Sequence, residues 1–207
     1  MPYDVVWLRY LTAVLALLLA AIALPMAAAE ALRAATHQSA PAPETVRAEA
    51  MLGWLRGDLW GAYALAEAER ADAGADAARQ AFRRAAEKAL SLAPYRPQLW
   101  LRLAKLYESD PRRATQFNAV VKMVYYTAPA DDAGMADRLQ MALSAAGSPD
   151  EELDEFARSD VRAMIAHGRL SELSAVYRSL GAGARVFIEH AVKSIRPDLA
   201  SSLTAPG

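Results

Sequence analysis

Apolar residues recur at steps of three and four along most of the chain after residue 43, which is the spacing of one helical face. The pattern is clearest in residues 97–108, where apolar or small side chains occupy positions i, i+3, i+4 and i+7: Trp100, Leu103, Ala104 and Tyr107. The run at residues 120–124 is the nearest approach to a strand, and it fits helical spacing better than a period of two. We therefore predict an all-α protein.

Glycine, proline and N-capping residues divide this pattern into short helices. Asp110 and Pro111 combine an N-cap residue with a proline at the first helical position, and residues 148–151 restart the chain with capping-box chemistry. Four glycines are the expected stops in the C-terminal third: Gly147, Gly168, Gly181 and Gly183. The expected helices cover residues 44–70 (as one helix or two), 76–92, 97–108, a helix that starts at 111 and carries an apolar stripe to 125, then 131–145, 149–166, 170–180 and 184–195. A short turn is expected at residues 196–198, and residues 201–207 are expected to fray.

The N-terminal segment at residues 10–29 contains no charged residue. About twenty predominantly apolar residues are enough to cross the hydrocarbon core of a membrane as a helix. Arg9 precedes the segment, and Trp7 and Tyr10 lie where aromatic side chains favour the headgroup region. We expect the N-terminus to stay in the cytoplasm and the rest of the chain to be periplasmic, anchored by one crossing of a bacterial-type inner membrane.

A cleaved secretory signal is the rival interpretation of the same segment. The apolar stretch ends at Pro25, and residues 27–29 are alanines that satisfy the A-x-A cleavage pattern. We favour an uncleaved anchor, because the apolar stretch is long for a signal and the region before it is weakly basic. A buried helix of a soluble protein is the third alternative, but an apolar surface on all sides is hard to enclose in so small a domain.

The chain is expected to have three parts. Residues 1–35 are the transmembrane anchor or signal segment, and residues 36–43 form a linker because they contain prolines and small polar residues. Residues 44–207 are long enough for one helical domain of ordinary size.

Composition narrows the class of protein further. Hydrophobic residues make up 54% of the chain, but many are alanines, which favour helix and allow helices to pack closely. The formal net charge is -1, so no overall attraction draws the chain toward nucleic acid. The sequence has no cysteine, which excludes disulfides, thiolate catalysis and cysteine-ligated metals.

Residues 94–107 resemble the first helix of a tetratricopeptide repeat, because Trp100, Leu103, the small Ala104 and Tyr107 occupy the positions of that family's pattern. Residues 89–94 resemble the end of the second helix of a preceding repeat. The prolines at 94 and 129 are 129 − 94 = 35 residues apart, close to the family's period of about 34. The resemblance covers roughly residues 60–130, and the order of Phe82 and Ala86 departs from it. It implies stacked antiparallel helix pairs, with the indole of Trp100 between neighbouring helices.

The three histidines do not have metal-ligand spacing. His37 lies in the expected linker, and His167 and His190 are 190 − 167 = 23 residues apart. His167 precedes Gly168 at an expected helix end, where capping of the helix explains it. We expect no metal site and no cofactor.

Charged and aromatic clusters have structural explanations beside the functional ones. The acidic run at residues 150–155 could bind a cation or a basic partner, but acids in the first turn of a helix also stabilise it through the helix dipole. Two arginine pairs could contact phosphate or an anionic sugar, or form solvated helix faces: Arg83 with Arg84, and Arg112 with Arg113. Aromatic residues at helical spacing are expected in the core rather than in a binding groove: Trp54 with Trp60, and Tyr125 with Tyr126.

No nucleophile elbow, phosphate-binding loop or dinucleotide fingerprint occurs in the sequence, and residues 181–183 are expected to form a turn. We name no catalytic residue and expect a non-enzymatic scaffold that binds a partner protein in the cell envelope, for instance in surface polysaccharide assembly. The alternative is an exported enzyme that acts on glycans through two paired carboxylates.

Overall fold

The computed structural model describes residues 3–36, 42–144, 149–199 and 203. Within these ranges the chain forms α-helices and short 3-10 helices and no strand, so the prediction of an all-α fold is confirmed. The helices are α1 (Tyr3–Thr36), α2 (Pro43–Leu52), α3 (Gly57–Asp72), α4 (Asp76–Leu92), α5 (Pro97–Glu108), η1 (Pro111–Arg113), α6 (Ala114–Thr127), α7 (Met135–Ala142), α8 (Glu151–Ala166), α9 (Leu170–Ser179), α10 (Ala182–Ile195) and η2 (Pro197–Leu199).

The chain divides into two compact units, Met1–Pro94 and Tyr95–Gly207. The sequence-based division placed residues 44–207 in one helical domain, and the structure distributes these residues between the two units. The border follows Pro94, the residue at which the sequence indicates a change of repeat. Residues 37–41 of the expected linker lie outside the described ranges, and Pro43 is already the first residue of α2.

The helices α4 and α5 have the predicted bounds, and residues 44–70 form two helices rather than one. The break lies at residues 53–56 and has a local cause. Gly53 ends α2 by donating its backbone N–H to the Glu49 carbonyl at 2.8 Å. A β-carbon at position 53 would collide with the side chain of Leu59, so the start of α3 packs closely against this turn.

Several helix bounds in the second half of the chain differ from the prediction: α6 begins at Ala114 after η1, α8 begins at Glu151 instead of residue 149, and α7 and α10 also differ. The helix expected at residues 131–145 is shorter, because the Asp131 carboxylate accepts the Gly134 N–H at 3.1 Å and holds a turn before α7 begins. The stop expected at Gly183 is wrong, since α10 starts at Ala182 and includes that glycine. Gly168 does end a helix and has a φ of 70°, a conformation that favours glycine. The expected stop at Gly147 lies outside the described residues.

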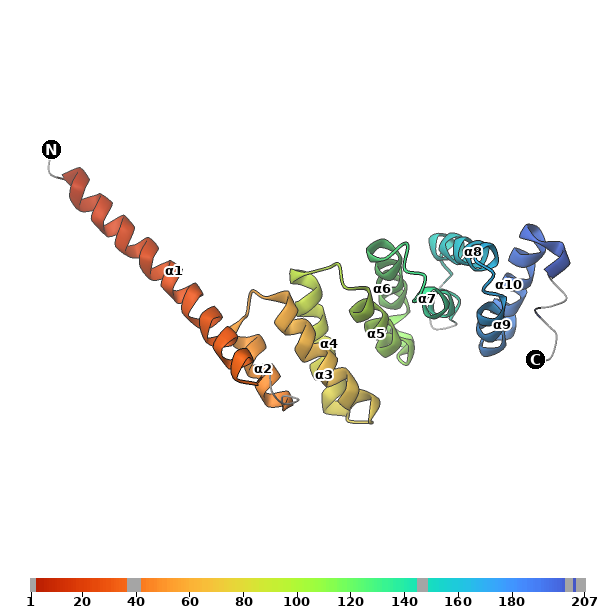
Figure 1. Ribbon diagram of the computed structural model, residues 1–207, viewed down its shortest axis with the longest axis horizontal. Coiled ribbons are helices and arrows are strands. Elements are labelled where there is room, and N and C mark those ends of the chain that lie inside the picture. The colour runs from red at the N-terminus through yellow and green to blue at the C-terminus, as the bar shows by residue number, and fades with distance from the viewer. Residues whose placement is uncertain (1–2, 37–41, 145–148, 200–202, 204–207) are drawn as a thin grey trace. The chain divides into compact units, whose positions relative to one another are not determined.

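Unit 1 is built around the antiparallel pair α3 and α4, with α2 packed on α3 and the end of α1 packed on α2 (Figure 1). Its core contains two aromatic rings, Tyr63 of α3 and Phe82 of α4, among alanines that let the helices approach closely. The approach is tightest at Gly57, where an added β-carbon would lie 2.8 Å from that of Ala93. Small residues therefore determine the spacing of this helix pair.

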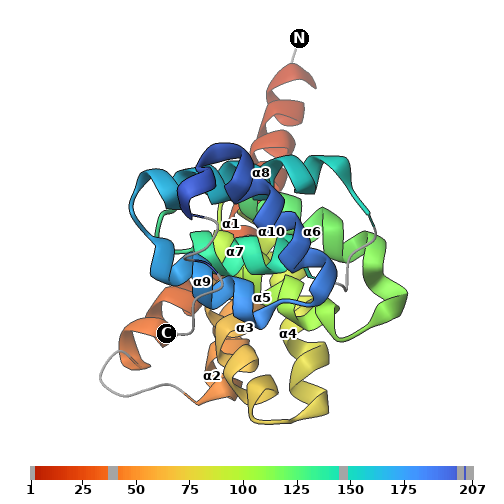
Figure 2. The same ribbon diagram turned by 90° about the vertical axis from the view of Figure 1, so that its right-hand side faces the viewer.

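Unit 2 contains the pair α5 and α6, followed by α7, α8, α9 and α10, of which the last three pack on one another (Figure 2). Its core combines the buried rings of Phe117 and Tyr125 with aliphatic residues that are fully enclosed in α6 to α10: Val121, Leu139, Val161, Leu173 and Ile188. In α5, Leu99 and Tyr107 are 2% and 6% exposed, but Trp100 is only partly buried. The expectation of a buried indole at position 100 is therefore met only in part.

Candidate functional site

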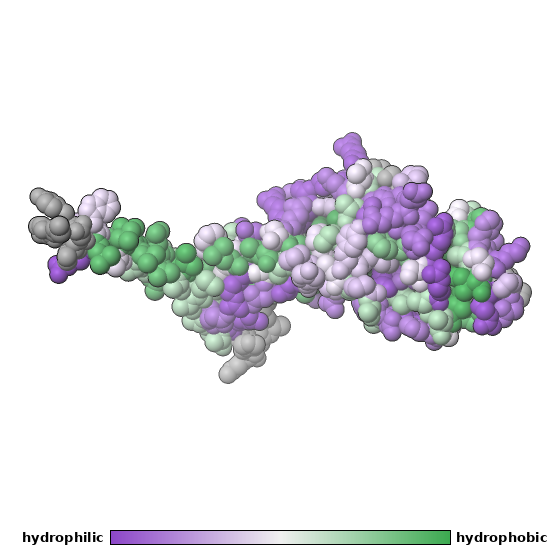
Figure 3. Space-filling view, turned by 90° about the horizontal axis from the view of Figure 1, so that it is seen from above, coloured by the Kyte–Doolittle hydropathy of each residue, from purple (hydrophilic) through white to green (hydrophobic). Residues whose placement is uncertain are grey.

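The N-terminal helix α1 exposes an apolar surface over most of its length. Within Trp7–Ala35 a window of 18 residues reaches a mean hydropathy of 2.4, and the helix is long enough to cross a membrane. Every side chain from residue 7 to residue 24 is exposed, and Figure 3 shows this part of α1 as a continuous hydrophobic shaft. An exposed apolar surface of this size is unfavourable in water and marks an interaction site.

The covered face of α1 begins at Pro25, which lies inside the helix. Pro25, Met26, Leu32 and Arg33 are partly buried and Ala29 is fully buried, so contacts recur every three or four residues along one face. This face packs on α2. The alanines of the suggested cleavage site thus belong to a continuous helix that is docked on the folded part of unit 1.

Ion pairs join the end of α1 to the turn between α2 and α3. Arg56 pairs with Glu30 of α1 and with Asp58, at 2.5 Å, and Arg33 of α1 reaches the same Asp58 carboxylate at 3.3 Å. The hydrogen bond from the Arg56 guanidinium lowers the pKa of Asp58. The charges that directly follow the apolar segment therefore compensate one another.

A buried ionic network in unit 2 joins α6, α7 and α8. Arg138 donates to both oxygens of Asp160, at 2.9 and 2.6 Å, and the Tyr125 hydroxyl donates to the same carboxylate at 2.9 Å. The guanidinium also donates to the carbonyls of Ala128 and Pro129. Burial and the negative charge of Asp160 raise the pKa of the Tyr125 hydroxyl well above its usual value. These hydrogen bonds occupy the carboxylate, which indicates a structural role.

The acidic run at residues 150–155 contributes to the packing of α8 on α6. Asp150 caps α8 by accepting the N–H groups of Glu152 and Leu153, each at 3.2 Å. Lys122 of α6 reaches Asp150 at 2.9 Å and Glu152 at 2.7 Å. The helix-start interpretation of this run is confirmed, and the structure adds a lysine that holds two of its acids.

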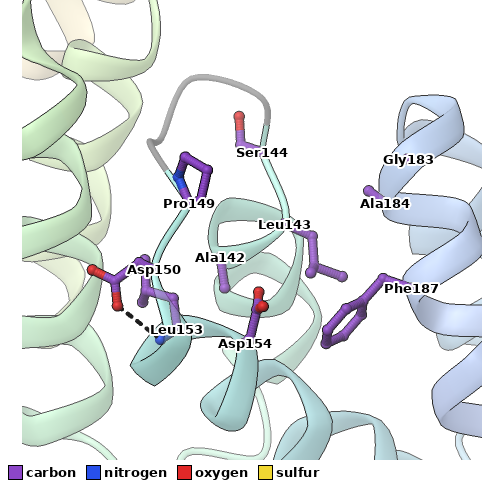
Figure 4. A pocket seen from close by; sticks show the side chains of 10 residues that line it. All are labelled: Ala142, Leu143, Ser144, Pro149, Asp150, Leu153, Asp154, Gly183, Ala184 and Phe187. Carbon is purple, nitrogen blue, oxygen red and sulfur yellow. Dashed lines mark hydrogen bonds between the residues drawn. The ribbon is translucent and has the colours of Figure 1, made fainter.

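A pocket of about 290 Å³ lies between α8, α10 and the end of α7. Figure 4 shows the Asp154 carboxylate directed into it, beside Phe187, while the Asp150 carboxylate turns away toward the α8 backbone that it caps. Two carboxylates line this pocket without converging on it. The geometry that a glycan-cleaving pair requires is therefore not found at this pocket.

A second pocket of about 270 Å³ forms a groove between α8 and α10. Its apolar floor includes Phe187 and Val186, and Val186 is 53% exposed. Its polar rim carries Arg158, Arg162 and His190 and no acidic residue. Arg158 lies 5.3 Å from the centroid of the Phe187 ring and also pairs with Glu155 at 3.6 Å, whereas Arg162 is exposed. The groove thus combines an apolar contact surface with positive charge.

The two histidines that the structure describes, His167 and His190, do not belong to any potential metal-binding group. His167 is exposed at the end of α8, 3.8 Å from an Asp132 oxygen, and His190 is exposed on α10. His37 lies outside the described residues. Among the residues that the structure describes, no group of three or more potential ligands could hold a metal ion.

The arginines of the two predicted pairs make different contacts. Arg113 lies over the Tyr107 ring at 5.0 Å and pairs with Asp110, while Arg112 is exposed. Arg84 is exposed and donates to Gln80. Arg112 and Arg113 thus differ in exposure and in their contacts.

The aromatic pairs divide between core and surface. Tyr125 is buried and stacks on Phe156 with ring centroids 4.7 Å apart, whereas Tyr126 is 52% exposed and donates to Glu152. Trp54 is 46% exposed, and Trp60 is partly buried. The core interpretation holds for Tyr125 and is wrong for Trp54 and Tyr126.

Sequence reasoning did not identify the groove or the buried network. Arg158 and Arg162 are four residues apart and share a face of α8, which the sequence shows, but only α10 adds the apolar side chains of the groove.

Comparison with known proteins does not assign a function, since no protein family, characterised protein or solved structure matches the chain.

Proposed function

We propose that this protein is a membrane-anchored, non-enzymatic scaffold that binds a partner protein on the periplasmic side of a bacterial-type inner membrane. The observation that carries the proposal is the division of α1 into an exposed apolar part and a docked end. A cleaved signal has no need to pack on the mature fold, whereas an anchor that is continuous with unit 1 holds the fold at the membrane.

The helix pairs α3–α4 and α5–α6 support a scaffold of the tetratricopeptide type. The helices α4 and α6 end at residues 92 and 127, which are 127 − 92 = 35 residues apart, near the period of about 34 in that family. Proteins built of such pairs bind other chains on their helical surfaces. Surface polysaccharide assembly is one envelope process in which a scaffold of this kind would serve.

The buried acids support a non-catalytic role. Asp160 is held by Arg138, and Glu67, 4% exposed, accepts from Arg70 at 3.0 Å. Both carboxylates are thus engaged in ion pairs within the fold rather than directed at a substrate site.

The groove between α8 and α10 is the surface that we assign to the partner. Its apolar floor and basic rim fit a partner segment that presents apolar side chains flanked by acidic ones. Arg162 is exposed on this rim and is available for such a segment, while Arg158 is already placed over Phe187.

Photo-crosslinking in intact membranes tests this assignment. A photoreactive phenylalanine analogue at Val186 is expected to crosslink a discrete partner, and mass spectrometry should locate the link in an acidic, apolar segment. The change Arg162→Glu should abolish that product, while Arg178→Glu, an exposed arginine on α9 outside the groove, should leave it intact. A product that survives Arg162→Glu, or a link in a basic segment, refutes the assignment.

A further inference from the structure

Three large apolar side chains are exposed together at the end of α2 and in the turn that follows. Met51 is 55% exposed, Trp54 46% and Leu55 43%. Elsewhere in α2 and α3, Val46 and Leu59 are buried. We call residues 51–55 the apolar turn. Exposed apolar side chains that lie close together are unfavourable in water and indicate a surface that contacts a partner.

The apolar turn lies beside the last turns of the membrane-spanning segment. α2 runs back along α1, and its ten residues cover about 15 Å at 1.5 Å per residue (Figure 1). The ion pairs from Arg56 to Glu30 and from Asp58 to Arg33 fix this register. The end of α2 is therefore level with the part of α1 in which the apolar run gives way to charged residues.

The turn is held in shape by its own hydrogen bonds. Trp60 donates its indole N–H to the Trp54 carbonyl at 3.3 Å, and the Arg56 N–H bonds the Gly53 carbonyl at 2.7 Å. Leu59 fills the space beside Gly53. The hydrogen bonds are made to backbone carbonyls of the turn, and the side chain of Trp54 stays about half exposed.

The aromatic residues of α1 lie at one end. Trp7 and Tyr10 are 75% and 69% exposed at the N-terminal end, whereas residues 25–36 contain no aromatic residue. Tryptophan and tyrosine are enriched at both membrane–water interfaces, where the ring contacts lipid and the polar tip contacts water. Trp54 lies at the level where the second interface would be if residues 10–29 span the bilayer.

We propose that the apolar turn is a second membrane contact, in which Trp54, Leu55 and Met51 insert into the interfacial region of the leaflet where α1 leaves the bilayer. The inference rests on the proposed anchoring of α1. The two contacts together would fix the tilt and rotation of unit 1 on the membrane surface, which one helix alone leaves free.

Spin-label accessibility in lipid nanodiscs tests the proposal. The chain has no native cysteine, so a nitroxide can be attached at one introduced cysteine in the full-length protein. The test site is Leu55→Cys, with Met51→Cys as a second site. Ala75→Cys is the aqueous control, because Ala75 is exposed beyond the far end of α3, which is about 24 Å long. Leu17→Cys, at an exposed site in the middle of the apolar shaft, is the hydrocarbon control.

The ratio of collisions with oxygen to collisions with a water-soluble nickel chelate is the readout. Labels at positions 55 and 51 are expected to give a ratio several-fold higher than at Ala75 and lower than at Leu17, as for an interfacial depth. A ratio equal to that at Ala75 overturns the proposal while leaving the anchor intact. A loss of both kinds of collision also overturns it, because it indicates contact with a second protein copy. A ratio at Leu17 equal to that at Ala75 would instead show that α1 does not span the bilayer. Failure of the anchor is therefore distinguishable from failure of the second membrane contact.

Discussion

Asp160 shows how one residue joins three helices of unit 2. Its carboxylate lies on α8 and binds Arg138 of α7 and Tyr125 of α6, and the side chains of Asp160 and Arg138 are each 4% exposed. Removing one partner of such a buried pair leaves the other charged and unpaired in a poorly solvated site, which is costly.

The change Asp160→Asn should therefore destabilise unit 2 strongly while keeping the shape of the side chain. We expect a loss of about 3 to 5 kcal/mol in the free energy of unfolding, a large part of the usual stability of a small domain. Chemical denaturation of the full-length protein in detergent measures it.

Asp198→Asn is the matched control, because Asp198 forms an exposed pair with Arg196 and should change stability little. Equal stability of the two variants would show that the Asp160 network is not a structural element.

At the scale of elements, Lys122 links α6 to the first turn of α8. The hydrogen bond from Lys122 lowers the pKa of Glu152. Burial alone would raise the pKa of Asp150, but its bonds to Lys122 and to the helix backbone outweigh burial and lower it. Carboxylates with a lowered folded pKa stabilise the fold above their unfolded pKa values, which are 3.8 for Asp150 and 4.5 for Glu152.

This contribution should disappear on acidification, as the pH falls through 4.5 and below 3.8 toward the lowered folded values. At pH 7 the change Lys122→Met should lower the Tm by a few degrees, and the difference from the native chain should shrink below the unfolded pKa values. Thermal melts across this pH range measure the difference. Lys105→Met, at an exposed lysine of α5, should give no such pH dependence. A Lys122 difference that stays constant down to the lowest pH would contradict the ionic link.

At the scale of the whole molecule, α1 is the candidate membrane anchor. The helix passes from an exposed apolar shaft to a docked end without a break, and its only proline, Pro25, stands at the change. The residues that follow the shaft carry frequent charges, so the chain offers one candidate crossing among the residues that the structure describes.

A reporter fused after Gly207 should be active when it requires an extracytoplasmic location and silent when it requires the cytoplasm. The physical reason is that one crossing with a cytoplasmic N-terminus exports everything that follows it. Reversed reporter activities would refute export.

Mass analysis of the same material distinguishes an anchor from a cleaved signal. Intact α1 should give a full-length, membrane-bound chain. Cleavage after Ala29 would leave Glu30 as the new N-terminus in a water-soluble product and would remove the part of α1 that docks on α2.

The sequence by itself determined the helices and the membrane-spanning candidate, because both depend on local information. Helical periodicity located α4 and α5 with their observed bounds, and an uncharged run of apolar residues is visible without any knowledge of packing. Of the bounds that were wrong, the starts of α7 and α10 depend on one side-chain hydrogen bond and on a glycine that a helix tolerates in its first turn.

Only the tertiary structure decided which charges pair and which apolar residues stay exposed. Asp160 and Arg138 are 22 residues apart, and Arg56 and Glu30 are 56 − 30 = 26 residues apart, so periodicity could not indicate either pair. The core prediction for Trp54 was wrong for the same reason, since helical spacing does not show whether another element covers that side chain. The position of a residue in the helical repeat shows which face of the helix it occupies. Which faces pack against one another then determines whether that residue lies in the core, forms an ion pair or belongs to a binding surface.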